Sequence, residues 1–256
     1  MSIVVFVEDW NGAYKKASYE AVGYAKNWAS MIGAKVIAVT SSNAPAAELA
    51  NYGADHCIQI SLGQTAMGIA GQLEALSSDV SGIVIAGTSL GRSVAPALAA
   101  IRESALSTNT ISLPLETSPL RVKRGAFSSK GIETIELSGA SPIISFVPNS
   151  IGIENTEGEG ILESQEIAST ELLRVVGTEI ASGKVALPEA EAVVSAGRGL
   201  KGPENWGMIE ELAEVLGAAT ACSKPVSDIG WRPHSEHVGQ TGIQVNPNLY
   251  IAIGIS

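Results

Sequence analysis

The sequence predicts an α/β protein built on a doubly wound, mostly parallel sheet. Three observations support this fold class. Short β-branched runs alternate with helical patterns through the first half, 45% of the residues are hydrophobic, and a second strand–helix–strand series begins at about residue 189. Strands that alternate with helices in this way are typical of parallel βαβ units.

Each element of the first half follows from its local pattern. The expected strands are residues 3–7, 35–40, 56–60 and 82–86, and the expected helices are residues 17–32, 45–52, 64–76 and 93–104. In the first of these helices, Ala21, Tyr24 and Trp28 recur at helical spacing. The second begins at Pro45, which the first turn of a helix tolerates, and Gly53 closes it.

The pattern changes after residue 112. The segments LRVKRGAF, ETIELS and PIISFVP, separated by short turns, predict a β-meander that adds antiparallel strands to the same domain. Residues 149–188 are rich in Glu, Gly, Ser and Asn, which predicts an acidic linker with one ordered strand near Ile180. We therefore expect an N-terminal domain over residues 1–188, linker included, and a second domain over residues 189–256.

The second domain has its own series of elements. Residues 192–195 predict a strand, and a helix is expected from about Pro203 to Leu216, closed by Gly217. Residues 218–222 and 249–253 predict two further strands, separated by a loop of about 25 residues. Loops of that length inside a compact domain usually carry function.

Composition excludes several classes of function. The net charge is −10 and no run of Lys or Arg is present, which argues against nucleic-acid binding. No stretch approaches the roughly 18 apolar residues of a membrane span. The N-terminus has no leader pattern, so we expect a cytoplasmic protein, or one of the mitochondrial matrix if a leader has been removed. The cysteines and histidines form no metal-ligand motif, and no catalytic triad or carboxylate pair is recognisable.

Three short segments carry polar groups where ligands bind in open α/β sheets, beyond strand ends. Arg198 lies between two glycines after the first strand of the second domain, where it could hold a pyrophosphate. Ser223 and Lys224 leave the next strand together, and HVGQTG, residues 237–242, is a glycine-flanked loop. The spacing around Arg198 is not that of the dinucleotide fingerprint G-x-G-x-x-G. Taken singly, each segment is also compatible with an ordinary surface turn.

Taken in order, these segments resemble one family. VVSAGRGLKGPENW, EELAEVLGAATACSKPVSDIGW and HVGQTGIQVNPNLYIAIGIS resemble the flavin-binding domain of the electron transfer flavoprotein α subunit, most closely over residues 190–256. GTSLGRSVAPALAA resembles a strand-to-helix turn of the family's first domain. The resemblance implies an adenine-nucleotide-hydrolase-like, partner-binding first domain of Rossmann-like topology and a flavodoxin- or deoxyhypusine-synthase-like FAD-binding domain. It also implies a β subunit as partner and electron transfer from dehydrogenases, such as acyl-CoA dehydrogenases, to a membrane quinone reductase.

The resemblance also implies which residues bind the cofactor. Arg198 would lie along the FAD pyrophosphate or the flavin, and the loop from Val238 to Thr241 would line the isoalloxazine ring, with the Thr241 hydroxyl near N5. Ser256 would open the segment that holds the pyrophosphate. The implied cofactor-binding residues are Arg198, Ser223, Lys224, Val238, Gly239, Gln240, Thr241 and Ser256.

The sequence departs from the family pattern at two places. Lys224 stands where the family has Arg, which keeps the charge and loses the planar guanidinium. The sequence ends at Ser256, where family members continue through a glutamine–histidine segment, so we expect an incomplete FAD-binding domain. Two alternatives to the electron carrier therefore stay open: a flavin-free scaffold for the β subunit, and a nucleotide-dependent oxidoreductase with its own substrate.

Overall fold

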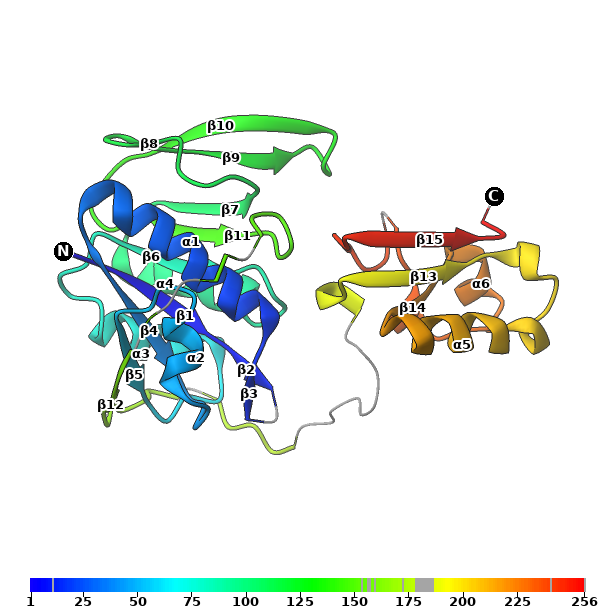
Figure 1. Ribbon diagram of the computed structural model, residues 1–256, viewed down its shortest axis with the longest axis horizontal. Helices are drawn as coiled ribbons and strands as arrows, with labels where there is room; N and C mark the ends of the chain where they lie inside the picture. The colour runs from blue at the N-terminus through cyan, green and yellow to red at the C-terminus, as the bar shows by residue number, and fades with distance from the viewer. Residues whose placement is uncertain are drawn as a thin grey trace. The chain divides into compact units, whose positions relative to one another are not determined.

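The computed structural model describes residues 1–10, 12–152, 154–155, 158, 160–171, 173–177, 187–239 and 241–255 (Figure 1). The chain forms two compact units, Met1–Thr178 and Glu179–Ser256, so the division falls slightly before the expected domain start at residue 189. No helix among the described residues is both long and apolar enough to cross a membrane.

The first unit is built on a ten-stranded sheet with the order β10-β9-β7-β11-β6-β1-β4-β5-β12, and β8 pairs with β9. Its strands are β1 (Ser2–Val7), β4 (Lys35–Thr40), β5 (His56–Gln59), β6 (Gly82–Ala86), β7 (Leu106–Thr110), β8 (Glu116–Thr117), β9 (Leu120–Ala126), β10 (Gly131–Leu137), β11 (Ile143–Phe146) and β12 (Ile161–Ser164). A separate hairpin consists of β2 (Asp9–Trp10) and β3 (Ala13–Tyr14). Seven adjacent strands run parallel to one another: β7, β11, β6, β1, β4, β5 and β12. Strands β8, β9 and β10 pair antiparallel, as the sequence predicts.

Helices cover both faces of this sheet (Figure 1). They are α1 (Lys16–Ile32), α2 (Ala46–Ala50), α3 (Ala66–Ala75) and α4 (Gly91–Arg102). Helix α1 buries Ala21, Tyr24 and Trp28 against one face, which confirms the helical spacing. The side chains of α3 and α4 pack with the opposite face of β1 and β6. An added Cβ at Gly82 would overlap the Trp28 ring, so the glycine lets α1 approach the sheet closely.

One strand of the expected meander belongs elsewhere. Strand β11 runs parallel between β6 and β7, at the centre of the sheet, and β7 itself was not anticipated from the sequence. All four residues of β11 are buried. A fully buried strand carries apolar residues on both faces, so its sequence has no alternation of apolar and polar residues that would reveal its neighbours. Its assignment to the antiparallel meander was therefore wrong.

The acidic segment after β11 is docked onto the first unit, and the linker prediction is wrong over its described residues up to 177. Glu20 of α1, 1% exposed, accepts hydrogen bonds from the backbone N–H groups of Asn149, Ile151 and Gly152. Further along, β12 pairs with β5. The acidic composition indicated solvated chain, whereas polar side chains here satisfy backbone groups. The strand expected near Ile180 falls outside the described residues.

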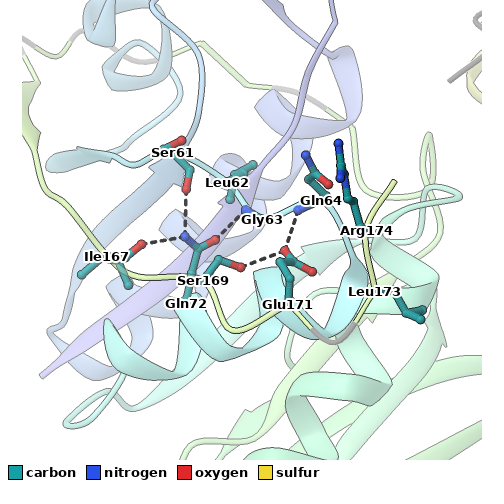
Figure 2. A pocket seen from close by; sticks show the side chains of 10 residues that line it. All are labelled: Ser61, Leu62, Gly63, Gln64, Gln72, Ile167, Ser169, Glu171, Leu173 and Arg174. Atoms are coloured by element: carbon teal, nitrogen blue, oxygen red, sulfur yellow. Dashed lines mark hydrogen bonds between the residues drawn. The ribbon is translucent and has the colours of Figure 1, made fainter. Parts of the chain in front are cut away.

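The end of this segment closes over a cavity of about 560 Å³ (Figure 2). Glu171 accepts hydrogen bonds from the N–H groups of Gln64 and Thr65 and from the Thr65 hydroxyl, so it satisfies donors just before α3. Gln72 of α3 donates to the carbonyl oxygens of Ser61 and Ile167 at 2.8 and 2.9 Å. Figure 2 shows Glu171 and Gln72 joining the segment to the loop before α3.

Acid is expected to release the Glu171 contact. Hydrogen bonds from Thr65 and Ser169 lower the pKa of Glu171 below its ordinary value. Because the folded-state pKa is depressed, the contact stabilises the fold at neutral pH, and that contribution is lost as the pH falls through the folded-state pKa. Amide hydrogen exchange at Gln64 and Thr65, corrected for intrinsic rates, should accelerate in acid. Glu171→Gln should accelerate it already at neutral pH, whereas the exposed Glu166→Gln should not; equal exchange in all three proteins would contradict this role.

The second unit is a three-stranded parallel sheet with the order β14-β13-β15. Its elements are β13 (Ala192–Ala196), α5 (Gly207–Leu216), β14 (Ala219–Cys222), α6 (Lys224–Asp228) and β15 (Leu249–Ile253), with short 3-10 helices at Leu187–Glu189, Arg198–Leu200, Pro203–Asn205 and His234–Glu236. The three expected strands and the helix are confirmed to within a few residues. Ile209 and Ala213 of α5 pack on Val194 and Ala196 of β13, forming the core of this unit.

Candidate functional site

The three strands of the second unit end at one edge of their sheet. Because they are parallel, the residues that leave them emerge side by side: Gly197 after β13, Ser223 after β14 and Gly254 after β15. The Gly197 N–H donates to the carbonyl oxygen of Ile253 at 2.9 Å. The Ser223 N–H donates to the carbonyl oxygen of Ala196 at 3.1 Å. Crevices at the carboxyl ends of strands are where ligands bind in open α/β sheets.

Glycines bring two of these strand exits into backbone contact. The Gly199 N–H donates to the Gly254 carbonyl oxygen at 2.9 Å. An added Cβ at Gly197 would lie 2.8 Å from the Cα of Ile255, and one at Gly199 would lie 2.6 Å from the Cα of Gly254. The glycines around Arg198 therefore serve close backbone packing, and the Arg198 side chain is left exposed at the strand ends.

Positive charge gathers at this edge. The described residues of the second unit include four Lys or Arg residues, and Arg198, Lys201 and Lys224 directly follow strand exits or the turn after one. The Arg198 side chain makes no hydrogen bond or ion pair with a described residue, and the Lys224 Nζ lies 3.4 Å from the Asp228 carboxylate in an exposed pair. In a chain of net charge −10, this edge is suited to an anionic ligand.

The HVGQTG loop forms a tight turn beside β14. The Val238 N–H donates to the Cys222 carbonyl oxygen at 3.1 Å, and the Ile243 N–H donates back to the His237 carbonyl oxygen at 2.8 Å. Gly239 has φ +144°, which favours glycine, and an added Cβ at Gly242 would lie 2.7 Å from the His237 ring. The turn therefore requires both glycines and leaves Thr241 exposed; Gln240 and Ser256 lie outside the described residues.

A cluster around Arg232 lies next to the start of this loop, and it was not predicted from the sequence. Arg232 stacks on the Trp206 ring at 5.2 Å, donates to the Glu236 carboxylate at 2.6 and 2.7 Å, and contacts Glu210 at 3.1 Å. Hydrogen bonds from Arg232 to Glu236 raise the pKa of Arg232 above its ordinary value. The i,i+4 spacing of Arg232 and Glu236 was the available signal. This cluster joins α5 to the 3-10 helix from which the loop begins.

The cysteine and the two histidines near the site are protonated, hydrogen-bonded or buried. Burial raises the pKa of the Cys222 thiol, at the end of β14, to about 11, so it is protonated at neutral pH. His234 shares a hydrogen bond of 2.7 Å with the Ser227 hydroxyl, and His237 is buried. The arrangement is thus one of cations, hydroxyl groups and backbone amides around a strand edge, which suits the binding of a phosphate-bearing cofactor.

Comparison with known proteins indicates which cofactor this domain binds. Residues 186–256 match the family model of the electron transfer flavoprotein FAD-binding domain, and residues 3–172 match that of the electron transfer flavoprotein domain. The chain belongs to the electron transfer flavoprotein α-subunit family. FAD is the cofactor of that domain, and the glycine-packed, cationic strand edge fits a dinucleotide with a pyrophosphate group.

Individual relatives agree with this family. The chain is 31% identical to the electron transfer flavoprotein subunit alpha of Syntrophomonas wolfei subsp. wolfei, over 98% of the chain and 82% of the relative. It is 29% identical to the electron transfer flavoprotein subunit alpha of Bacillus subtilis, over 99% of the chain and 82% of the relative. It is also 29% identical to subunit LctC of the lactate dehydrogenase (NAD(+),ferredoxin) of Acetobacterium woodii, over 99% of the chain and 65% of the relative.

The six described residues of the expected cofactor set lie on segments that leave or flank two neighbouring strands. Arg198 follows β13, Ser223 and Lys224 follow β14, and Val238, Gly239 and Thr241 lie in the loop paired with the end of β14. Their contact with FAD stays a prediction. The structure adds Gly254 and the Arg232 cluster, which shape the same edge.

Proposed function

We propose that this chain binds FAD at the carboxyl edge of β13, β14 and β15 and carries electrons as the α subunit of a heterodimer. The observation that carries the proposal is the convergence of Arg198, the Ser223–Lys224 pair and the HVGQTG loop at one edge of the FAD-binding domain. Bound FAD supplies reversible acceptance and release of electrons.

Each residue has a separate task in this proposal. Arg198, exposed and without an ion-pair partner among the described residues, holds the pyrophosphate. Lys224 would supply a cation, and Thr241 and Ser223 would supply hydroxyl groups, to a bound flavin, whose reduction adds negative charge. Fixed positive charge and donors at such a position favour the reduced form and raise the reduction potential. A lysine there holds charge without the fork of an arginine, so it orients the ring less strictly.

We propose that the first unit carries the contact with the β subunit, and that dehydrogenases donate electrons and a quinone reductase accepts them. The name of the LctC relative places that protein in a dehydrogenase, so a second candidate role for this chain is the electron-transfer subunit of a dehydrogenase complex. In both roles the chain passes electrons without turning over a substrate of its own, because transfer between redox centres requires no nucleophile or general acid from this subunit.

The test is cofactor retention by the chain co-expressed with its β subunit. A flavin absorption spectrum and release of FAD on heating are expected. A stable, colourless heterodimer would contradict FAD binding and would favour the scaffold. Reduction by a small substrate without an added dehydrogenase would contradict the carrier and favour the oxidoreductase.

Substitution of the two cations is expected to separate binding from redox tuning. Arg198→Gln should weaken FAD affinity about 10-fold, the scale of one charge-assisted hydrogen bond. Lys224→Gln should lower the flavin midpoint potential, and Lys224→Arg should preserve it. The matched control is Arg121→Gln, an exposed arginine of the first unit that pairs with Glu116 and Glu136. If Arg198→Gln retains FAD as well as Arg121→Gln does, the proposed role of Arg198 is wrong.

A further inference from the structure

The first unit contains a second cavity, of about 230 Å³, which the flavin site does not explain. It lies between the first turns of α4 and the ends of β6, β7 and β11, and its lining includes Gly87, Arg92, Pro96, Thr108, Asn109 and Ser145. It is therefore at the carboxyl edge of parallel strands, beneath the GTSLGRSVAPALAA motif that the sequence singled out.

A bulge in β7 forms one wall of this cavity. Ile144 pairs with Ser107, but the next pair is Phe146 with Thr110. Two residues of β7, Thr108 and Asn109, thus oppose Ser145 alone. Asn109 has φ +54°, a left-handed conformation that is uncommon for residues other than glycine. Bulges are enriched beside functional sites because they redirect side chains.

Several polar groups at the cavity lack protein partners. Ser145 is 3% exposed, and its hydroxyl makes no hydrogen bond with any described residue. The Nε of Arg92 donates to the Gly87 carbonyl oxygen at 2.9 Å, and no partner for its two terminal nitrogens occurs within the described ranges. Pro96 has no N–H, so the carbonyl oxygen of Arg92 lacks its usual helical donor. A buried hydroxyl normally has a partner, so Ser145 calls for a ligand; the Arg92 and Asn109 side chains at the same cavity are exposed and open to one.

The charge of the residues that line the cavity favours a negatively charged ligand. Arg92 is the one charged residue in the described lining. The first turn of α4 does not supply the site by itself, because the Gly91 N–H already donates to the Thr88 hydroxyl and the Arg92 N–H to the Thr88 carbonyl oxygen. The side chains of Arg92, Ser145 and Asn109 are instead the available donors, and all three can bind an oxyanion.

The usual ligand position in this sheet is already filled. The strand order reverses between β1 and β6, where doubly wound sheets commonly bind ligands. Glu8, 6% exposed, occupies that crevice: it contacts the Thr88 hydroxyl and lies 3.1 Å from Lys15. A buried carboxylate repels an anion there, so the cavity beside Arg92 is the better anion site of the two.

We propose that this cavity binds a small oxyanion, the phosphate or carboxylate group of a metabolite, with Arg92 as counter-ion and Ser145 and Asn109 as hydrogen-bond donors. The volume is below the range of about 300–1,000 Å³ for drug-sized ligands, so the ligand is small. The site lies wholly within the first unit and does not depend on the flavin.

Calorimetric titration of the full chain, purified with whatever subunit accompanies it, tests the proposal. Inorganic phosphate and acetate are titrated separately at constant ionic strength, with chloride as the balancing anion. Saturable binding of at least one is expected. Tighter binding of phosphate identifies a phosphorylated ligand, and tighter binding of acetate identifies a carboxylate.

Variants locate the site. Arg92→Gln should weaken the preferred anion about 10-fold and Ser145→Ala about 3-fold, consistent with loss of a charged and a neutral hydrogen bond. Arg121→Gln is the matched control and should bind as the unaltered chain does. Thermal unfolding of each variant checks that it is folded. If Ser145→Ala does not fold, the backbone amide chemical shifts of Gly87 and Val147 in the unaltered chain, measured during anion titration, report binding at this cavity. Absence of saturable binding, or equal weakening by Arg92→Gln and Arg121→Gln, overturns the proposal.

Discussion

Gly197→Ala is expected to destabilise the second unit by about 3 kcal/mol and to reduce FAD retention at least about 10-fold. The added Cβ would fall 2.8 Å from the Cα of Ile255 and closer still to the Gly254 carbonyl oxygen. Both obstacles are backbone atoms, so no side-chain rotation relieves the clash. The ends of β13 and β15 must separate, which also breaks the hydrogen bond from the Gly197 N–H to Ile253.

Denaturant unfolding and FAD content measure this effect, and Gly207→Ala is its matched control. Gly207 begins α5, and an added Cβ there meets nothing within 4 Å. Alanine is the better helix former, so Gly207→Ala should leave FAD bound and raise stability by up to about 1 kcal/mol. If Gly197→Ala behaves like Gly207→Ala, close backbone packing is not what shapes the strand edge.

Glu20→Ala is expected to cost the first unit about 3 kcal/mol of stability. The change leaves the N–H groups of Asn149, Ile151 and Gly152 without their acceptor and creates a gap beneath the chain that leaves β11. These three hydrogen bonds are only partly buried, so the loss is smaller than the sum of three fully buried hydrogen bonds. Urea unfolding measures the loss, and unchanged stability would contradict the role of Glu20 as an anchor.

Glu20→Gln tests the charge separately, because glutamine keeps the size of the side chain. Burial raises the pKa of Glu20, and the three backbone N–H groups offset this only in part. A raised folded-state pKa means that the contribution is fully present below the unfolded-state pKa and is lost as the pH rises through the folded-state pKa. The stability advantage of the unaltered chain over Glu20→Gln should therefore shrink with rising pH across that window. A constant difference would show that Glu20 does not titrate there.

Local pattern accounts for most of the elements and fails where burial removes the pattern. Helix α1 could be predicted because Ala21, Tyr24 and Trp28 recur on one face. Strand β11 could be detected as an apolar run, but its neighbours could not, because both of its faces are buried. The acidic segment was mistaken for a linker because composition does not reveal that Glu20 and Glu171 accept from backbone groups far away in the sequence.

The sequence by itself determined the α/β class, the strand ends that carry Arg198, Ser223 and Lys224, and the resemblance from which FAD follows. These three features depend on residues that are close in the sequence and on the order of the motifs, both of which the sequence shows directly. Only the tertiary structure decided that Gly197, Gly199 and Gly254 meet, that Arg232 supports the HVGQTG loop, and that Arg92, Asn109 and Ser145 surround one cavity. Those contacts join residues from different strands and helices, and no local propensity specifies such a distance.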